Sequence, residues 1–178
     1  MITLICGTNR PDSRSAVILT HYAKVLKTKG MDHQILLLHD LPIELFNVGM
    51  YDGDNMCDPL KAIQEQFIFD VEKFIIVSPE YNGGMSGVLK LFIDAISVRE
   101  YPKNFKGKKY LLTGVSSGRA GNLRGLESLT GILNYLGGFV FPQKLPISNV
   151  ETLILENELK DEDTITAIEQ HINSFNNF

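Results

Sequence analysis

Short apolar runs alternate along the chain with longer stretches in which apolar residues recur at helical spacing. Brief runs of aliphatic and β-branched residues between polar or glycine-containing segments are typical of buried strands. Their continuous apolar character indicates strands covered on both faces. The predicted strands are Ile2 to Cys6, His33 to Leu38, Lys73 to Ser78, Lys109 to Val115, and a fifth that starts at Phe139 to Phe141.

The stretches between these strands predict helices. In the first of them Ile18, Tyr22 and Val25 fall on one face, and Gly30 follows as a glycine that ends a helix. Further helices are predicted over Pro59 to Phe69, from Val88 to Ile96, from Leu123 to about Leu136 and over Asp163 to Phe175, whereas His39 to Asp58 is predicted to be irregular and Tyr101 to Gly107 a turn.

This alternation of strand and helix favours a parallel sheet with helices on both faces. Right-handed crossovers then restrict the topology strongly. No internal repeat, low-complexity segment or domain boundary interrupts the pattern. The prediction is one α/β domain over residues 1–178, a flavodoxin-like three-layer sandwich with a five-stranded parallel sheet in the order 2-1-3-4-5.

Composition narrows the function classes. The chain has 178 residues and a net charge of −4 with no basic block, which argues against nucleic acid as a partner. No apolar run approaches the roughly 20 residues that span a bilayer, and the N-terminus lacks a signal-peptide layout. The two cysteines, Cys6 and Cys57, suggest neither a disulfide framework nor a metal cluster. We therefore expect a cytoplasmic protein without a membrane partner.

Three polar, glycine-containing loops follow the first, third and fourth predicted strands. In the order 2-1-3-4-5 these loops emerge at the carboxyl edge of the sheet and surround the switch point between strands one and three, where such folds bind ligands. The central loop, Ser78 to Gly84, combines a carboxylate, a phenol, an amide and two glycines. A plain turn does not require that combination, which predicts a planar cofactor at this edge.

The loop after the first strand has the composition of a phosphate site. Thr8, Ser13 and Ser15 supply hydroxyls, Arg10 supplies a planar charged fork, and the following helix offers N–H groups at its N-terminus. The alternative is that Ser13 or Ser15 merely caps that helix. The loop lacks the Gly-Lys-Ser/Thr ending of a P-loop and the three-glycine dinucleotide pattern, so it points to a monophosphate such as that of FMN.

The other two loops have the features of a ring site. In the central loop Tyr81 can lie beside an aromatic ring, and the N–H groups from Glu80 to Gly83 could meet the ring's edge. The alternatives are that Tyr81 is a core residue and Glu80 a solvated charge. Ser116 to Arg119 could cover the ring's polar end, or could form a plain turn. Lys90 and Asp94 are better explained as an i,i+4 helix pair.

Two segments resemble the signatures of the NAD(P)H-dependent FMN reductase family. Gly7-Thr8-Asn9-Arg10-Pro11-Asp12-Ser13 is similar to its Gly-Ser-x-Arg-x-x-Ser loop, and Pro79-Glu80-Tyr81-Asn82-Gly83 to its second motif. That family includes quinone, chromate and azo-dye reductases that are usually dimers or tetramers. The resemblance implies that the FMN phosphate is held by Thr8, Arg10, Ser13 and Ser15, and the isoalloxazine by Pro79, Glu80, Tyr81, Asn82, Gly83, Ser116, Ser117 and Gly118.

The chain also departs from the family pattern. Thr8 replaces the usual Ser and keeps the hydroxyl, whereas Ser86, Leu91 and Ala95 stand where many members have Pro, Asn and Trp. The last three lie on the helix after the central loop, which contributes to subunit contacts in the family. These departures affect the expected oligomer and substrate range more than flavin binding.

The expected chemistry belongs mainly to the flavin. NADPH or NADH would deliver a hydride to FMN, and a quinone or similar small acceptor would then take two electrons in a ping-pong cycle. No Ser-His-Asp or Cys-His constellation suggests a side-chain nucleophile. The alternatives are a flavodoxin-like electron carrier that does not oxidise NAD(P)H, and a flavin-free interaction module on the same fold.

Overall fold

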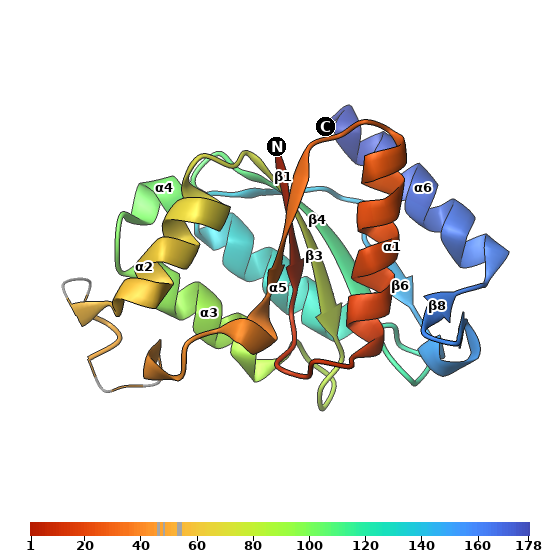
Figure 1. Ribbon diagram of the computed structural model, residues 1–178, viewed down its shortest axis with the longest axis horizontal. Coiled ribbons are helices and arrows are strands. Elements are labelled where there is room, and N and C mark those ends of the chain that lie inside the picture. The colour runs from red at the N-terminus through yellow and green to blue at the C-terminus, as the bar shows by residue number, and fades with distance from the viewer. Residues whose placement is uncertain (46, 48, 53–54) are drawn as a thin grey trace.

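The sheet has the predicted order. The computed structural model describes residues 1–45, 47, 49–52 and 55–178. Its parallel strands run β2-β1-β3-β4-β5, which confirms the flavodoxin-like order 2-1-3-4-5 (Figure 1). The first four strands are β1 (Ile2–Cys6), β2 (His33–Leu37), β3 (Lys73–Pro79) and β4 (Lys109–Val115).

The fifth strand position is interrupted. Both β5 (Phe139–Val140) and β6 (Leu145–Ile147) pair with β4, the first with its beginning and the second with its end. Pro142 lies between them and has no N–H to donate to a sheet ladder. The prediction that strand five starts at Phe139 is confirmed, but the strand resumes only after a break.

Helices cover both faces of the sheet (Figure 1). On one face lie α1 and α6, which contact each other, and on the other face lie α2 to α5. The bounds are α1 (Arg14–Thr28), α2 (Asp58–Gln64), α3 (Gly87–Ser97), α4 (Tyr101–Phe105), α5 (Leu123–Tyr135) and α6 (Glu162–Asn176). None of the helices in these described segments is long and apolar enough to cross a bilayer.

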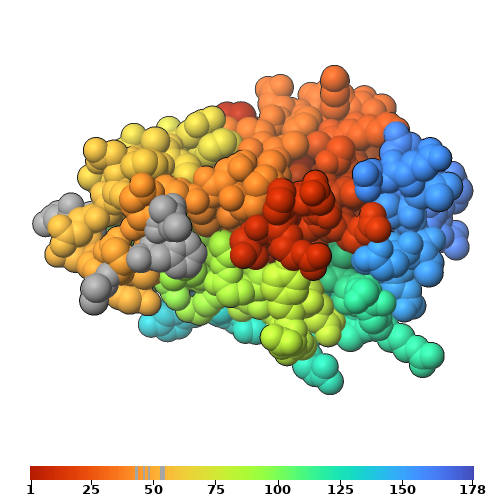
Figure 2. Space-filling model, turned by 60° about the horizontal axis from the view of Figure 1, so that its bottom comes forward, coloured from red at the N-terminus to blue at the C-terminus, as the bar shows by residue number. Residues whose placement is uncertain are grey.

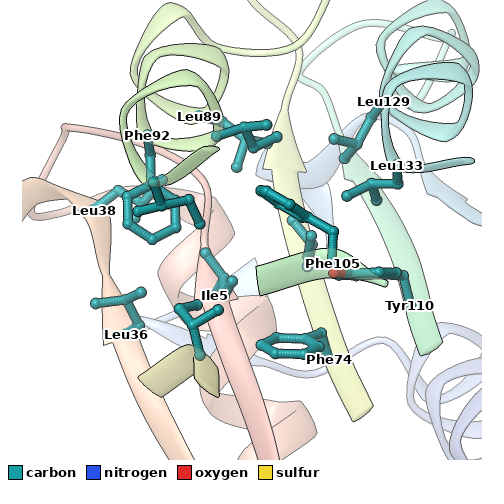
Figure 3. Close-up of a cluster of buried hydrophobic side chains, with 14 of the residues drawn as sticks. Ile5, Leu36, Leu38, Phe74, Leu89, Phe92, Phe105, Tyr110, Leu129 and Leu133 are labelled. Atoms are coloured by element: carbon teal, nitrogen blue, oxygen red, sulfur yellow. The ribbon is translucent and has the colours of Figure 1, made fainter. Parts of the chain in front are cut away.

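Two hydrophobic clusters follow from the alternation of side chains along each strand. In β3, Phe74 and Ile76 belong to the cluster under α2 to α5, whereas Ile75 and Val77 belong to the cluster under α1 and α6. Figure 3 shows the first cluster, where Ile5, Leu36 and Phe74 from the strands meet Leu89 and Phe92 from α3. Burial on both faces explains the continuous apolar runs in the sequence.

Four segments differ from the prediction or extend it. Tyr101 to Gly107 is not a simple turn, because Tyr101–Phe105 forms the short helix α4 with Pro102 in its first turn and Phe105 buried. The helix predicted over Pro59 to Phe69 is α-helical to Gln64 and continues as a π-helix, η4 (Glu65–Phe69).

The connection from His39 to Asp58 contains the 3₁₀ turns η1 (Leu38–Asp40) and η2 (Ile43–Leu45), and positions 46, 48, 53 and 54 lie outside the described residues. Between β6 and the acidic stretch before α6 no helix or strand is predicted. The structure has there a 3₁₀ turn, η5 (Val150–Thr152), and a small hairpin of β7 (Ile154–Leu155) and β8 (Glu158–Leu159).

Candidate functional site

The three polar loops meet around an open pocket at the carboxyl edge of the sheet. The pocket has a volume of about 410 Å³. Figure 2 looks onto this edge, with the first loop in red at the centre, the central loop in yellow-green below it, and the segment after β6 in blue to the right. The lining residues are Arg10, Asp12, Ser13, Arg14, Ser15, Pro79, Glu80, Tyr81, Val115, Ser116, Ser117, Val150, Glu151 and Asn157.

In the first loop two of the side chains predicted to bind phosphate have no hydrogen-bond partner among the described residues. Ser13 is the N-cap of α1, since its hydroxyl accepts a hydrogen bond of 3.1 Å from Ala16 N–H. The exposed Arg10 guanidinium and the Ser15 hydroxyl have no partner among the described residues. The same is true of the Arg14 and Ser15 N–H groups in the first turn of α1. Capping therefore accounts for Ser13, and the other donors stay available to an anion.

Thr8 connects the first loop to the central loop. It is fully buried and does not line the pocket, and its hydroxyl lies 2.6 Å from the phenol oxygen of Tyr81. Ser86 adds a second link, because its hydroxyl donates to the carbonyl of Gly7 and also caps α3 by accepting from Leu89 N–H at 3.2 Å. The Ser86 departure from the family pattern thus fixes one loop against the other.

The central loop is a tight hairpin. Tyr81 and Gly84 exchange N–H···O=C bonds of 2.9 and 3.1 Å, and Asn82 and Gly83 between them both have positive φ, 52° and 76°. This is the Asn-Gly turn that favours type I′ hairpins. The predicted ring-edge donors are fewer than expected, because Glu80 N–H is bonded to Val115 O and Tyr81 N–H to Gly84 O. Neither Asn82 nor Gly83 lines the pocket, although their N–H groups have no partner among the described residues.

Glu80 is held by the start of α5. Its carboxylate accepts a hydrogen bond of 2.9 Å from Asn122 N–H and faces the pocket, so it is more than a solvated charge. Asn122 is fully buried, and its side-chain amide donates to Ser78 and Pro79 carbonyls at 3.1 and 2.9 Å. The hydrogen bonds of Asn122 therefore fix the loop after β4 against the end of β3.

The third loop has one residue that organises it and one that is free. The Ser116 hydroxyl donates to Gly118 O and accepts from Gly121 N–H, both at 2.9 Å, which holds the turn together. Ser117 is exposed and lines the pocket, whereas Gly118 does not line it. A Cβ added at Gly118 would meet open space, so that glycine is not required by close packing.

Six lining residues were not predicted from the sequence: Asp12, Arg14, Val115, Val150, Glu151 and Asn157. Arg14 and Glu151 form an ion pair, with 2.7 Å between Arg14 Nε and a Glu151 carboxylate oxygen. Glu151 and Asn157 come from η5 and the β7–β8 hairpin, for which the sequence carried no periodic signal. Asp12 lies inside the recognised motif and Arg14 directly follows it, so both could have been named from that loop.

The pocket is suited to binding rather than to covalent catalysis. Cys6 lies beneath the first loop, and burial raises the pKa of its thiol to about 11, so the thiol stays protonated at neutral pH. The described residues contain no group of His, Cys, Asp and Glu that could hold a metal ion. Lys90 and Asp94 form the expected i,i+4 pair, with 2.6 Å between Lys90 Nζ and the carboxylate. The unpaired donors at the α1 N-terminus fit a phosphate, and the hairpin and third loop leave space for a flat ring.

Comparison with known proteins agrees with this geometry. The family described as NADPH-dependent FMN reductase matches residues 1–152. The chain is 30% identical to a 2-hydroxy-1,4-benzoquinone reductase from Burkholderia sp. over 135 residues, which are 76% of this chain and 70% of that protein. It is 24% identical over 151 residues to an NADPH azoreductase from Bacillus sp. (strain OY1-2), covering 84% of this chain and 77% of that protein.

Solved structures share the fold. The flavoenzyme NAD(P)H:(acceptor) oxidoreductase FerB from Paracoccus denitrificans superposes with a TM-score of 0.79 at 21% identity, over 98% of this chain and 93% of that one. An NADH:FMN oxidoreductase, EMOB, gives 0.74 at 19% identity, over 98% and 87%. The family match confirms the resemblance seen in the two loop motifs. The chain belongs to the NADPH-dependent FMN reductase family, a family of oxidoreductases with FMN as cofactor and NAD(P)H as co-substrate.

Proposed function

We propose that the protein transfers a hydride from NAD(P)H through bound FMN to a quinone or a similar small acceptor in a ping-pong cycle. The observation that carries the proposal is the pocket itself: the two family motifs form its walls, and Arg10 and Ser15 point unpaired donors at it. When bound, FMN supplies the redox chemistry, and the chain supplies binding, orientation and electrostatics.

The first loop is proposed to hold the FMN phosphate. Arg10 provides a bidentate charged donor, Ser15 a hydroxyl, and α1 two free N–H groups with the positive end of the helix dipole. Thr8 and Ser13 support the site indirectly: the Thr8 hydroxyl orients Tyr81, and Ser13 caps the helix. All four residues predicted from the sequence thus contribute, two by contact and two by support.

The central and third loops are proposed to hold the isoalloxazine. Tyr81 is fixed by Thr8, and Glu80 by Asn122, so both side chains are in place before the ring binds. The Asn82 and Gly83 N–H groups remain as donors for the ring's polar edge, beside Pro79. Ser117 covers its other end, and Ser116 and Gly118 form the turn that carries it. A preorganised site of this kind loses little conformational freedom on binding.

The acceptor class is proposed from the relatives. One is named for a benzoquinone and the other for azo compounds, and both classes are small conjugated molecules that accept two electrons. NADPH and NADH are both candidate donors. A cytoplasmic location, where these nucleotides are supplied, is part of the same proposal.

An absorption spectrum tests the function directly. The protein is reconstituted with FMN and desalted, and the spectrum is repeated anaerobically after addition of NADPH or NADH. Retained flavin that bleaches with a nucleotide and recovers on addition of a benzoquinone is the expected result. Retained flavin that neither nucleotide bleaches would indicate an electron carrier, and absence of retained flavin would overturn the FMN site.

A homodimer is proposed as the working form. Between α3 and α5 lies a groove of about 400 Å³ whose apolar residues include Ile93, Ile132 and Leu136, and Tyr135 beside it is 86% exposed. Exposed aromatic residues such as Tyr135 are enriched at protein–protein interfaces. The native mass in solution tests the proposal, and Tyr135→Ser is expected to raise the monomer fraction. A wild-type monomer at micromolar concentration would contradict it.

A further inference from the structure

An ion pair closes one side of the pocket. Arg14 Nε and a Glu151 carboxylate oxygen are 2.7 Å apart, and both side chains line the pocket. The pair is partly exposed, with 39% of the Arg14 side chain and 55% of the Glu151 side chain accessible. Ion pairs this exposed contribute little to fold stability, so the pair is free to respond to a ligand.

The positions of both partners are set by the backbone. Arg14 is the first residue of α1 and follows the N-cap Ser13 directly. Glu151 belongs to η5, which is anchored by the buried Val150 and by its N–H bond of 3.0 Å to Ser116 O. The carboxylate is therefore tied to the third loop and the guanidinium to the first. The backbone of each partner is thus held at the rim of the pocket, while the two partly exposed side chains keep their rotamer freedom.

The charges around this pair suit a bound phosphate, but the Glu151 carboxylate would compete with that phosphate for Arg14. The first turn of α1 contains no acidic residue of its own. Of the three acidic residues that line the pocket, Asp12, Glu80 and Glu151, Glu151 is the one paired with a residue of that turn, Arg14. Arg14 and Ser15 both lie in the first turn of α1 and both line the pocket, so a phosphate bound to the Ser15 hydroxyl would share the pocket with the Arg14 guanidinium. Arg14 would attract that phosphate, and the Glu151 carboxylate would repel it.

We propose that Arg14 is a second phosphate-binding arginine and that Glu151 competes with the phosphate for it. The pair then sets how strongly the pocket prefers FMN over riboflavin, which has the same ring and no phosphate. The inference rests on the proposed function, because it places the FMN phosphate at the start of α1. It goes further by assigning selectivity to two residues outside the family motif.

Binding of FMN and of riboflavin to variants tests this, with the quenching of flavin fluorescence as the readout. In Glu151→Gln the competing charge is removed, so the FMN dissociation constant should fall about threefold to fivefold, as for a partly exposed charge pair. The riboflavin constant should stay within about twofold. In Arg14→Gln the FMN constant should rise by a similar factor, again with riboflavin little changed.

Glu65→Gln is a matched control. Glu65 also pairs with an arginine, Arg99, at 2.6 Å, and its side chain is likewise 55% exposed, but it does not line the pocket. It should leave both flavin constants unchanged. Equal shifts for FMN and riboflavin, or an FMN constant in Glu151→Gln equal to that in Glu65→Gln, would overturn the inference. Wild-type protein that binds neither flavin would instead overturn the proposed function.

Discussion

The two edges of the sheet use their cationic side chains in opposite ways. At the amino edge, Lys73 donates to Phe175 and Asn176 carbonyls at 3.2 and 2.9 Å, and so caps the end of α6. Lys108 donates there to the Ile68 and Phe69 carbonyls at the end of the π-helix η4. At the carboxyl edge Arg10 has no partner among the described residues, and Arg14 has one that a ligand could replace.

The helix dipoles explain the contrast. Helix C-termini lie at the amino edge, where carbonyls without helical partners and partial negative charge attract lysines. At the carboxyl edge α1 presents its N-terminus, which is already positive, so an arginine beside it gains nothing from the helix. Arginines at such a position are stabilised by an added anion. The same residue class is thus paired with helix carbonyls at one edge and, in our proposal, available to a ligand at the other.

The largest effect in this comparison of the two edges is expected when the buried Lys108 of the amino edge is replaced. Lys108 is 7% exposed, and in Lys108→Met the Ile68 and Phe69 carbonyls lose their donor while the volume is roughly kept. We expect the free energy of unfolding to fall by about 2 kcal/mol, the usual result of leaving buried carbonyls unpaired. Denaturant unfolding measures the change.

Besides stability, the FMN affinity of Lys108→Met is measured. The FMN dissociation constant of Lys108→Met should equal that of the wild type, because the lysine lies at the edge opposite the pocket. Lys106→Met is the control, since Lys106 is exposed on the same edge and should lose almost no stability. Equal stability of the two variants would mean that the lysines at this edge are not structural.

Arg10→Ala should have a smaller effect, and it should change flavin affinity and not the stability of the fold. Loss of a charged hydrogen-bond donor to the phosphate should weaken FMN binding about tenfold, or about 1.4 kcal/mol. The unfolding midpoint without flavin should not change, because Arg10 is exposed and has no partner among the described residues. Titration with FMN and riboflavin measures the effect. An unchanged FMN constant would remove Arg10 from the phosphate site.

Most of the fold was predictable because burial on both faces leaves a plain sequence signal. The bounds of β1 and β4 agree with the apolar runs Ile2–Cys6 and Lys109–Val115. The failures lie where local signals compete. Pro102 and Gly107 suggested a turn, but Pro102 fits the first turn of a helix and Phe105 is drawn into the core, so α4 forms.

The candidate site was predictable as a set of loops around one pocket, but not as a set of contacts. The motif spacing named Arg10 and Ser15, and both line the pocket. It could not show that Thr8 bonds to Tyr81, because that bond joins residues from two loops far apart in sequence. It missed Glu151 because a 3₁₀ turn after an interrupted strand has no period to detect. Tertiary placement, not residue type, decides these roles.

The last test of the comparison is the pH dependence of the Lys108 contribution. Burial lowers the pKa of Lys108 from 10.5 to about 8. Between these pH values the unfolded chain holds a proton that the folded chain has released, so this group makes the free energy of unfolding rise with pH. The neutral amine still donates to the two carbonyls and is less costly to bury.

The stability difference between wild type and Lys108→Met should therefore be constant below about pH 7, and should grow as the pH rises through the window from about 8 to 10.5. Urea unfolding at a series of pH values measures it, and subtraction of the variant removes every other titrating group. Lys106→Met should show no such growth. A difference that stays flat across the window would mean that Lys108 is as well solvated when folded as when unfolded, and that the amino edge is not closed by its own chain.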